Sequence, residues 1–475
     1  MKKLFFPVVL LLSNFLNGLA AQDSTTIFNR EDFLEMVSLF HPVMRQGQLI
    51  MDQANVALGA ARGVFDPKWY GQFDQKSFDK KDYFAVGEAG VKIPTWMGID
   101  FKTAYNWSSG VYLNPEDNLP QNGQAIIGLE VPLGQGLFID ERRAAVKRAR
   151  LAAEASEFER LQLQNDLYRE AMEAWWNWAF NYHRLNAYAE ALSMAQQRFD
   201  AIRESYFLGD VPAMDTLESL IQVQNRSVEF NQATLDFRQA GAYLSVFLWS
   251  EDQVPLELPD GVRPPDLPEP TERLSPDQIL AWQQRMESMH PDLKLLDYKS
   301  LDLSIKERLK VEQLKPSLNL TYNFLGNGFD LVNSESASNL SALFADNYKW
   351  GLQFNMPLLL RKERNGLKMV RIEMDQNYNK IQLKRQDLSA KVMAYAQEVN
   401  FKFDQANEFR DMLRNNRLLL EMEREKFNIG ESSVFLINSR EQKFIDTRIK
   451  RIKTIVEYEK ARVKLQWATG TPSRQ

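Results

Sequence analysis

Residues 317–324 read SLNLTYNF, and residues 348–356 read YKWGLQFNM. Apolar and polar side chains alternate in both stretches. A period of two, with one apolar and one polar face, predicts half-buried β-strands. The apolar positions, which would share one face of the sheet, are Leu318, Leu320, Tyr322 and Phe324 in the first stretch and Tyr348, Trp350, Leu352, Phe354 and Met356 in the second.

The same alternation occurs earlier in the chain, at residues 99–107 and 127–131. Its apolar positions are Ile99, Phe101, Tyr105 and Trp107, then Ile127, Leu129 and Val131. The strands have about the length of a tilted membrane strand, roughly 9 to 11 residues. Aromatic residues end their apolar faces, as in the girdles of membrane barrels. The pattern alone fits a water-soluble antiparallel sheet equally well.

The residues between Pro67 and Ile99 are harder to interpret. Pro67 would start a strand at Lys68, but residues 68–81 alternate poorly. We therefore expect residues 68–98 to form either an additional hairpin or an ordered loop.

The N-terminus favours the membrane interpretation of the strands. Lys2 and Lys3 precede an apolar run over residues 4–12, and small residues follow at Gly18, Ala20 and Ala21. This layout predicts a signal peptide over residues 1–22, because the apolar run is too short to span a bilayer. A buried N-terminal helix is the alternative. We expect the mature chain to lie outside the cytoplasm.

Composition excludes several classes of function. The chain has no cysteine, so we expect no disulfide, no thiol catalysis and no lipidated N-terminus. After the signal no run of 18 apolar residues remains, which leaves a periplasmic protein or a β-barrel. A net charge of −5 argues against nucleic acid, and three histidines argue against a histidine-rich metal site. No nucleotide-binding loop or Ser/His/Asp constellation is evident, so we expect no cofactor and no enzyme activity.

Landmarks recur in the same order along the chain. The His-Pro step at His41 returns 249 residues later at His290, and Pro67 returns at Pro316 with the same offset. Both copies then show an apolar-Pro-Leu step, an aromatic-x-x-Gly step and a closing tryptophan. These are Val131-Pro132-Leu133 and Met356-Pro357-Leu358, Tyr206 to Gly209 and Phe427 to Gly430, and Trp249 and Trp467. We predict a first repeat over residues 23–250, a proline-rich connector over 251–276 and a second repeat over 277–470.

Each repeat contains a long stretch of strong helix formers. Residues 140–206 lack proline and glycine, and residues 361–427 contain one glycine near their start. Each predicted helix would be roughly 100 Å long at 1.5 Å per residue, which requires packing along other helices. The glycines after them suit helix C-termini, and Pro212, Ser432 and Ser433 suit the start of a returning helix. We predict helical hairpins over 140–249 and 361–467, with the aromatic cluster at residues 175–180 packing between helices or stacking on a ligand.

Four strands are too few for a closed barrel. The smallest common membrane barrels need about eight, and open edges in lipid leave backbone groups unpaired. Several chains must then share one barrel, and three would supply 12 strands.

The chain resembles the TolC family of outer-membrane efflux proteins over almost its whole mature length. The resemblance rests on the two helix-strand-strand-helix copies, the apolar-Pro-Leu steps into very long helices and the aromatic-x-x-Gly tips. It implies an α+β membrane protein: a homotrimer whose 12-stranded barrel in the outer membrane continues into a helical barrel in the periplasm. It also implies an exit duct for tripartite efflux or type I secretion, docked to a periplasmic adaptor and an inner-membrane pump of the RND, ABC or another class.

The resemblance assigns roles to three groups of residues. The acidic periplasmic entrance would comprise Asp210, Asp215, Glu218 and Glu431. The tip and adaptor contact would comprise Gly209, Val211, Pro212, Gly430, Ser432, Ser433 and Phe435. The strands would face outer-membrane lipid with Trp107, Leu318, Leu320, Tyr322, Phe324, Trp350, Leu352 and Phe354.

Other interpretations of these residues remain. A ring of carboxylates would attract cations, but acids in a first helical turn are also favoured by the helix dipole. The second copy has no aspartate pair, and its Phe435 is expected to pack between helices rather than narrow a pore. For the whole chain, the alternative function is a periplasmic coiled-coil adaptor or scaffold.

Overall fold

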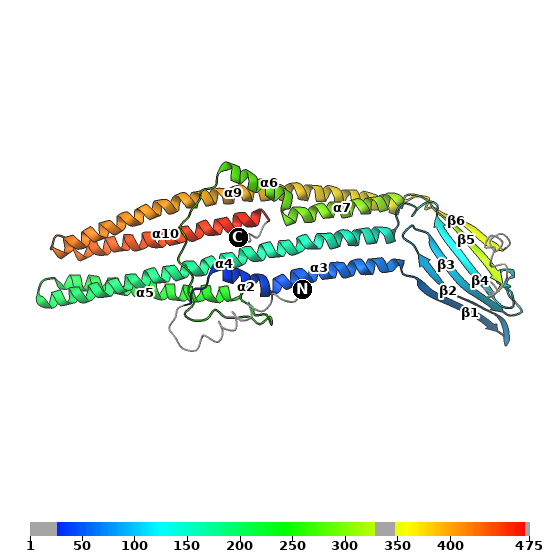
Figure 1. Ribbon diagram of the computed structural model, residues 1–475, viewed down its shortest axis with the longest axis horizontal. Coiled ribbons are helices and arrows are strands. Elements are labelled where there is room, and N and C mark those ends of the chain that lie inside the picture. The colour runs from blue at the N-terminus through cyan, green and yellow to red at the C-terminus, as the bar shows by residue number, and fades with distance from the viewer. Residues whose placement is uncertain (1–25, 328–346, 471–475) are drawn as a thin grey trace, which may run out of the picture. The chain divides into compact units, whose positions relative to one another are not determined.

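A computed structural model describes residues 26–327 and 347–470 of the chain (Figure 1). The predicted signal peptide, residues 1–22, lies outside the described residues. The first half contains α2 (Arg30–Phe40), α3 (Pro42–Arg62), η1 (Gly63–Phe65), β1 (Lys68–Phe78), β2 (Lys81–Pro94), β3 (Asp100–Ser109), η2 (Pro115–Asp117), β4 (Gln124–Pro132), α4 (Glu141–Leu208) and α5 (Ala213–Ser245). The second contains α6 (Pro276–Met289), α7 (Pro291–Glu312), β5 (Ser317–Asn327), β6 (Tyr348–Asn355), α9 (Arg361–Asn428) and α10 (Val434–Ala468).

The two His-Pro steps break a helix in equivalent places. His41 separates α2 from α3, and His290 separates α6 from α7. Both histidines have extended backbones, with ψ of 133° and 125°, because a following proline disfavours the helical conformation. The prolines then start the next helices, where their missing N–H is not needed. These positions explain the histidines as helix breaks.

The long helices are close to the predicted ones. α4 and α9 have 68 residues each. α4 starts one residue and ends two residues later than predicted, and α9 starts at the predicted residue and ends one residue later. α5 and α10 return from them with 33 and 35 residues. Within residues 26–327 and 347–470, no helix is long and apolar enough to cross a membrane.

Contacts group the chain into two compact units, which do not coincide with the predicted repeats. Among the described residues, unit 1 comprises 26–48, 161–290 and 385–470, and unit 2 comprises 49–160, 291–327 and 347–384. Each unit therefore combines segments from both halves of the chain. Unit 2 contains all six strands.

Tryptophans of α4 form the centre of unit 1. Trp175, Trp176 and Trp178 are 2%, 2% and 0% exposed, and they pack with Phe33 of α2 and Val463 of α10. This burial agrees with the predicted packing role. Their indole N–H groups find no hydrogen-bond partner among the described residues.

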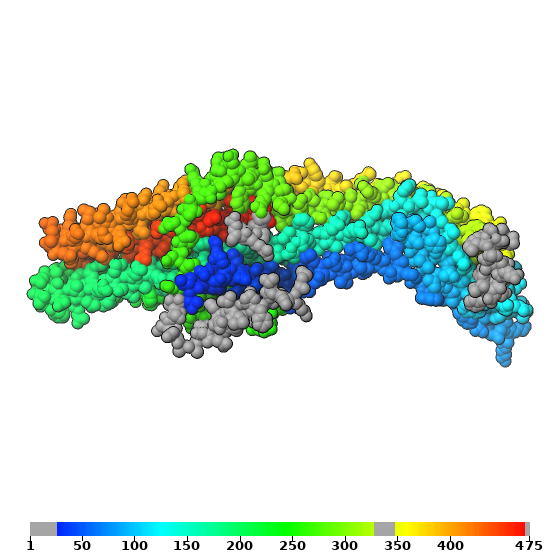
Figure 2. All heavy atoms as spheres, in the orientation of Figure 1, coloured from blue at the N-terminus to red at the C-terminus, as the bar shows by residue number. Residues whose placement is uncertain are grey.

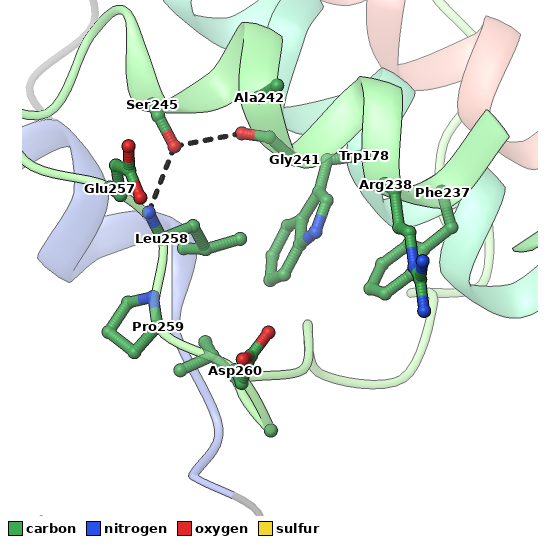
Figure 3. A pocket seen from close by; sticks show the side chains of 12 residues that line it. Trp178, Phe237, Arg238, Gly241, Ala242, Ser245, Glu257, Leu258, Pro259 and Asp260 are labelled. Carbon is green, nitrogen blue, oxygen red and sulfur yellow. Dashed lines mark hydrogen bonds between the residues drawn. The ribbon is translucent and has the colours of Figure 1, made fainter. Parts of the chain in front are cut away.

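A cavity of about 400 Å³ lies beside this core (Figure 3). Trp178 lines it together with Phe237 and Gly241 of α5 and Leu258 of the connector. The Ser245 hydroxyl closes one side, since it donates to the Gly241 carbonyl and accepts from the Leu258 N–H. The cavity is thus formed where the connector crosses α5.

The connector runs across unit 1 and touches several helices. The Arg263 carbonyl accepts from the Phe28 N–H at 2.9 Å, and the Glu272 carbonyl accepts from the Tyr458 hydroxyl at 2.8 Å. Asn400 of α9 both accepts from and donates to the backbone of Leu274. The prolines of the connector prevent a helix, so these contacts satisfy the backbone N–H and C=O groups of an extended segment.

The six strands in the described part of the chain form one antiparallel sheet in sequence order, β1-β2-β3-β4-β5-β6 (Figure 1). The expected four strands per chain were therefore wrong. Residues 68–94 form the additional hairpin, β1–β2, which was one of the two alternatives for the first half. Its turn at Asp79 and Lys80 has φ of 51° and 60°, as in the two-residue turns that match strand twist.

Candidate functional site

One face of the six-stranded sheet is apolar from edge to edge. Directly paired residues point to the same side of a sheet, so the register assigns every residue to a face. Along one row, Val91 pairs with Thr103, which pairs with Ile127, which pairs with Phe324, which pairs with Tyr348. The large apolar residues of this face are Trp69, Phe73, Val91, Ile93, Phe101, Tyr105, Trp107, Ile127, Leu129, Val131, Leu318, Leu320, Tyr322, Phe324, Tyr348, Trp350, Leu352 and Phe354.

Much of this apolar face is exposed in the single chain. Trp69 is 85% exposed, Trp350 60% and Phe354 65%. A contiguous apolar surface of this kind marks an interaction with membrane or protein. All eight residues predicted to face lipid lie on this face: Trp107, Leu318, Leu320, Tyr322, Phe324, Trp350, Leu352 and Phe354. Their contact with lipid stays a prediction.

The opposite face is polar and carries ion pairs across the strands. Lys92 of β2 lies 3.2 Å from Asp100 of β3 and 3.1 Å from Glu130 of β4. Lys102 of β3 lies 2.7 Å from Glu88 of β2. A sheet with one apolar and one ionised face is suited to separate lipid from water.

Alternation alone missed β1 and β2, although a weaker signal was present. On the apolar face β2 carries Ala85, Gly87 and Ala89 before Val91, and small residues make a poor period-two signal. The Asp-Lys pair between two stretches rich in aromatic residues was the usable clue.

The ends of the two helical hairpins lie at the same end of unit 1, in green and orange on the left of Figures 1 and 2. Gly209 and Gly430 have φ of 87° and 79°, a conformation that favours glycine. The N–H groups of Gly209 and Asp210 donate to Tyr206 and Ser205. Gly430 and Glu431 repeat this pattern with Phe427 and Lys426. Both long helices therefore end in the same hydrogen-bonded glycine cap.

The residues beside the glycines are open to solvent on the single chain. Asp210, Pro212, Glu431 and Ser433 are exposed, and Figure 2 shows no other segment over either tip on the face drawn. Pro212 and Ser433 immediately precede α5 and α10, in the places predicted for helix starts. Val211 is half-buried. Phe435 is 65% exposed on the single chain, and its packing between helices stays a prediction.

The predicted acidic residues have different surroundings. Asp215 lies in the first turn of α5 and is half-buried. Glu218, one turn further, accepts from the amide of Asn438 on α10 at 3.4 Å. The structure thus joins the two hairpins through Glu218 and leaves Asp210 and Glu431 at the outer ends of the tips.

Sequence reasoning missed a buried ionic cluster close to the tips. Glu441 of α10 has a side chain only 2% exposed and pairs with two arginines, Arg198 of α4 and Arg424 of α9. Arg198 also donates to Asn438 at 2.6 Å. From the sequence alone, a glutamate in a helix is expected at the surface. Glu441 is buried only because α4 and α9 pack beside it. The cluster ties three helices together.

A second group holds the end of the α9–α10 hairpin. Glu423 accepts from the Ser432 hydroxyl at 2.6 Å and from Arg440 at 3.3 Å. The hydrogen bond from Ser432 and the charge of Arg440 hold the pKa of Glu423 below its usual value.

We therefore expect acid to loosen this tip. A lowered pKa adds stability above the ordinary glutamate pKa of about 4.3, and this stability disappears as pH falls through the lowered value. The protection of residues 423–433 against hydrogen exchange, corrected for the pH dependence of the intrinsic rate, should fall at the acid end of a titration from pH 7 to about 3. Ser432→Ala should lower this protection already at pH 7 and leave a smaller loss on acidification, and an unchanged acid response would contradict this coupling.

The described residues show no group of three or more histidine, aspartate and glutamate side chains arranged to hold a metal ion. The site consists of surfaces instead: an amphipathic sheet in unit 2 and two capped helical tips in unit 1.

An amphipathic antiparallel sheet and long helical hairpins in one chain are the elements that the resemblance to the TolC family implied. No protein-family model and no curated protein sequence matches this chain. Among solved structures, the CmeC outer membrane channel of Campylobacter jejuni matches 95% of this chain over 90% of its own, with a TM-score of 0.63 and 13% identity.

Two further channels match over similar lengths. The outer membrane protein VceC of Vibrio cholerae matches 93% of this chain over 95% of its own, with a TM-score of 0.64 and 11% identity. The MtrE outer membrane channel of Neisseria gonorrhoeae, in its open state, matches 92% over 88%, with a TM-score of 0.66 and 11% identity. These likenesses show that the chain has the channel fold.

Proposed function

We propose that this protein is the outer-membrane exit duct of an efflux or type I secretion system. It acts as a passive channel and not as an enzyme. The observation that carries the proposal is the apolar face that crosses all six strands in a chain with the fold of outer-membrane channels. The sheet would lie in the outer membrane, and the helical hairpins would extend into the periplasm.

The proposed working form is a homotrimer. Its partners would be a periplasmic adaptor at the helical tips and an inner-membrane pump that supplies the driving force. The class of the pump, whether RND, ABC or another, is a property of the pump partner and is not determined by this chain. Exposed glycine caps on both hairpins support a docking role for the tips.

Fractionation tests the proposal directly. The protein should sediment with the outer membrane, require detergent for extraction and form ion-conducting channels in planar bilayers. A periplasmic adaptor or scaffold, the second candidate, would dissolve without detergent. Exposed Trp69, Trp350 and Phe354 on one sheet face argue against that candidate, because water would meet a broad apolar surface.

Bulky charged substitutions at the tip glycines should impair docking and leave assembly intact. In Gly430→Arg the new side chain needs a left-handed backbone, at about 1 to 2 kcal/mol, and places a charge on the tip surface. Adaptor recovered in pull-down should fall severalfold while the trimer yield stays unchanged. Gly430→Asn, which tolerates this backbone, is the matched control. Equal recovery of the adaptor with both variants would show that this tip does not contact the adaptor.

Neutralising the acids at the first tip should reduce cation selectivity. Asp215→Asn and Glu218→Gln remove up to six negative charges from a trimer, two for each copy. The reversal potential in a salt gradient should shift toward that of an unselective channel. Asp260→Asn, in the connector, provides a control remote from the tips. Unchanged selectivity in the double variant would place both acids away from the conducting path.

A further inference from the structure

The sheet has two open edges, at β1 and β6. Among the residues that the structure describes, each of these strands has a hydrogen-bonded neighbour on one side only. Soluble proteins protect such edges with charges, prolines or bulges. On the apolar face, β1 carries Trp69, Gly71, Phe73 and Gln75, and β6 carries Tyr348, Trp350, Leu352 and Phe354. The charges of the two edge strands, Lys68, Asp74, Lys76 and Lys349, all lie on the polar face, so the apolar face of neither edge is protected by a charge or proline. An open edge in lipid leaves backbone groups unpaired.

Each edge is complementary to the other edge of an identical copy. Six consecutive antiparallel strands make β1 and β6 run in opposite directions. A second copy can therefore place its β6 beside β1 as one more antiparallel pair. Both apolar faces then point to the same side, and no strand has to change direction.

A barrel of only four strands per chain would require the β1–β2 hairpin to stand outside the wall, with β3 as the edge. The packing between β2 and β3 opposes this. They pair without interruption from Ala85↔Ser109 to Pro94↔Asp100. On the apolar face the Trp107 ring covers Gly87, where an added Cβ would lie 2.1 Å from the ring. The hairpin is fitted to β3 and is not an appendage.

The polar face joins the same three strands. Glu88 of β2 accepts from Lys102 of β3 at 2.7 Å and from the Tyr70 hydroxyl of β1 at 2.7 Å. Tyr70 also lies over Gly90, where a Cβ would come within 2.7 Å of its hydroxyl. Aromatic residues covering cross-strand glycines hold the register of sheets that form barrel walls.

We infer that β1 of one copy pairs with β6 of the next, so that all six strands form the barrel wall and three copies close a barrel of 18 strands. This inference rests on the proposed trimeric duct and concerns its membrane part. Barrel diameter increases roughly linearly with strand number, so the barrel is about half as wide again as one of 12 strands. The ion pairs of Lys92 and Lys102 line its interior.

Engineered disulfides test the inference, because the natural chain has no cysteine. Gln72→Cys on the polar face of β1 is combined with Gln353→Cys, Gly351→Cys or Lys349→Cys on the polar face of β6. The three pairs sample registers two residues apart. After oxidation in whole cells, we expect one pair to give covalent dimers and trimers, and nothing larger, on non-reducing gels. On the same gels, the single-cysteine variants should give at most dimers. These variants also serve to show that each substituted chain still assembles.

The decisive comparison moves the first cysteine to β3. Asn106→Cys lies level with Gln72, because both residues pair with Glu88. It is combined with the same three β6 variants. Cross-linking through Asn106→Cys, or no cross-linking in a membrane-inserted trimer, would overturn the 18-stranded wall and leave the duct intact. A chain that is monomeric and soluble without detergent would instead overturn the proposed function.

Discussion

Replacing Leu320 with arginine is expected to prevent the protein from accumulating in the outer membrane. Leu320 lies on the apolar face of β5, between Val131 of β4 and Leu352 of β6. An arginine that faces lipid costs up to about 2–4 kcal/mol at the middle of the bilayer and less toward its edges, and every copy in the assembly bears this cost. That is a large part of the roughly 5–15 kcal/mol that stabilises a typical fold. Quantitative immunoblots of outer-membrane fractions should show a loss of tenfold or more.

The next residue on the same strand provides the matched control. Thr321 lies on the polar face, opposite Glu130 and Gly351. Thr321→Arg adds the same charge and volume on the side that would face water, beside a carboxylate. It should accumulate nearly as the unmodified protein does. Equal losses for both variants would show that the apolar face does not meet lipid.

Removing the Glu441 carboxylate is expected to loosen the helical tips more than any other single change there. Glu441→Ala leaves Arg198 and Arg424 close together without their shared anion. Breaking a buried ion pair costs about 3–5 kcal/mol. Arg198 is 12% exposed, but Arg424 is 43% exposed, so solvent offsets part of the cost for Arg424. Hydrogen exchange should increase more than tenfold at residues 194–202 and 434–445, with the sheet unchanged.

An exposed pair on the same hairpin is the control. Glu421 lies 3.1 Å from Arg417, and their side chains are 54% and 72% exposed. Exposed pairs contribute about 0–1 kcal/mol, so Glu421→Ala should change exchange little. Similar effects of Glu441→Ala and Glu421→Ala would mean that the buried cluster does not hold the tips.

The wider barrel and the buried cluster concern different parts of the duct. The 18-stranded barrel would set the width of the duct in the membrane. The buried cluster around Glu441 would set how firmly the two helical tips of one chain are held together. If the tips limit flow, the additional hairpin changes the barrel without changing conductance. Strand pairing is therefore the direct test of the barrel.

Local patterns in the sequence were enough to predict several elements. The alternation from Ser317 onward predicted β5, and the runs without proline predicted α4 and α9 within two residues at either end. Gly209 and Gly430 were predicted as helix ends, and their φ values agree. In each case the signal comes from neighbours in the chain: period-two polarity, helix propensity or the freedom of glycine.

The sequence by itself therefore determined the long helices α4 and α9, the strands β3 to β6 and which face of these strands is apolar. Only the tertiary structure decided that β1 and β2 complete the sheet, that Glu441 is buried, and that the halves combine into two mixed units. The physical reason is distance along the chain. The face of Gly87 is defined by Trp107, and the burial of Glu441 is defined by Arg198, 243 residues earlier in the sequence. Such properties arise only when distant segments pack together.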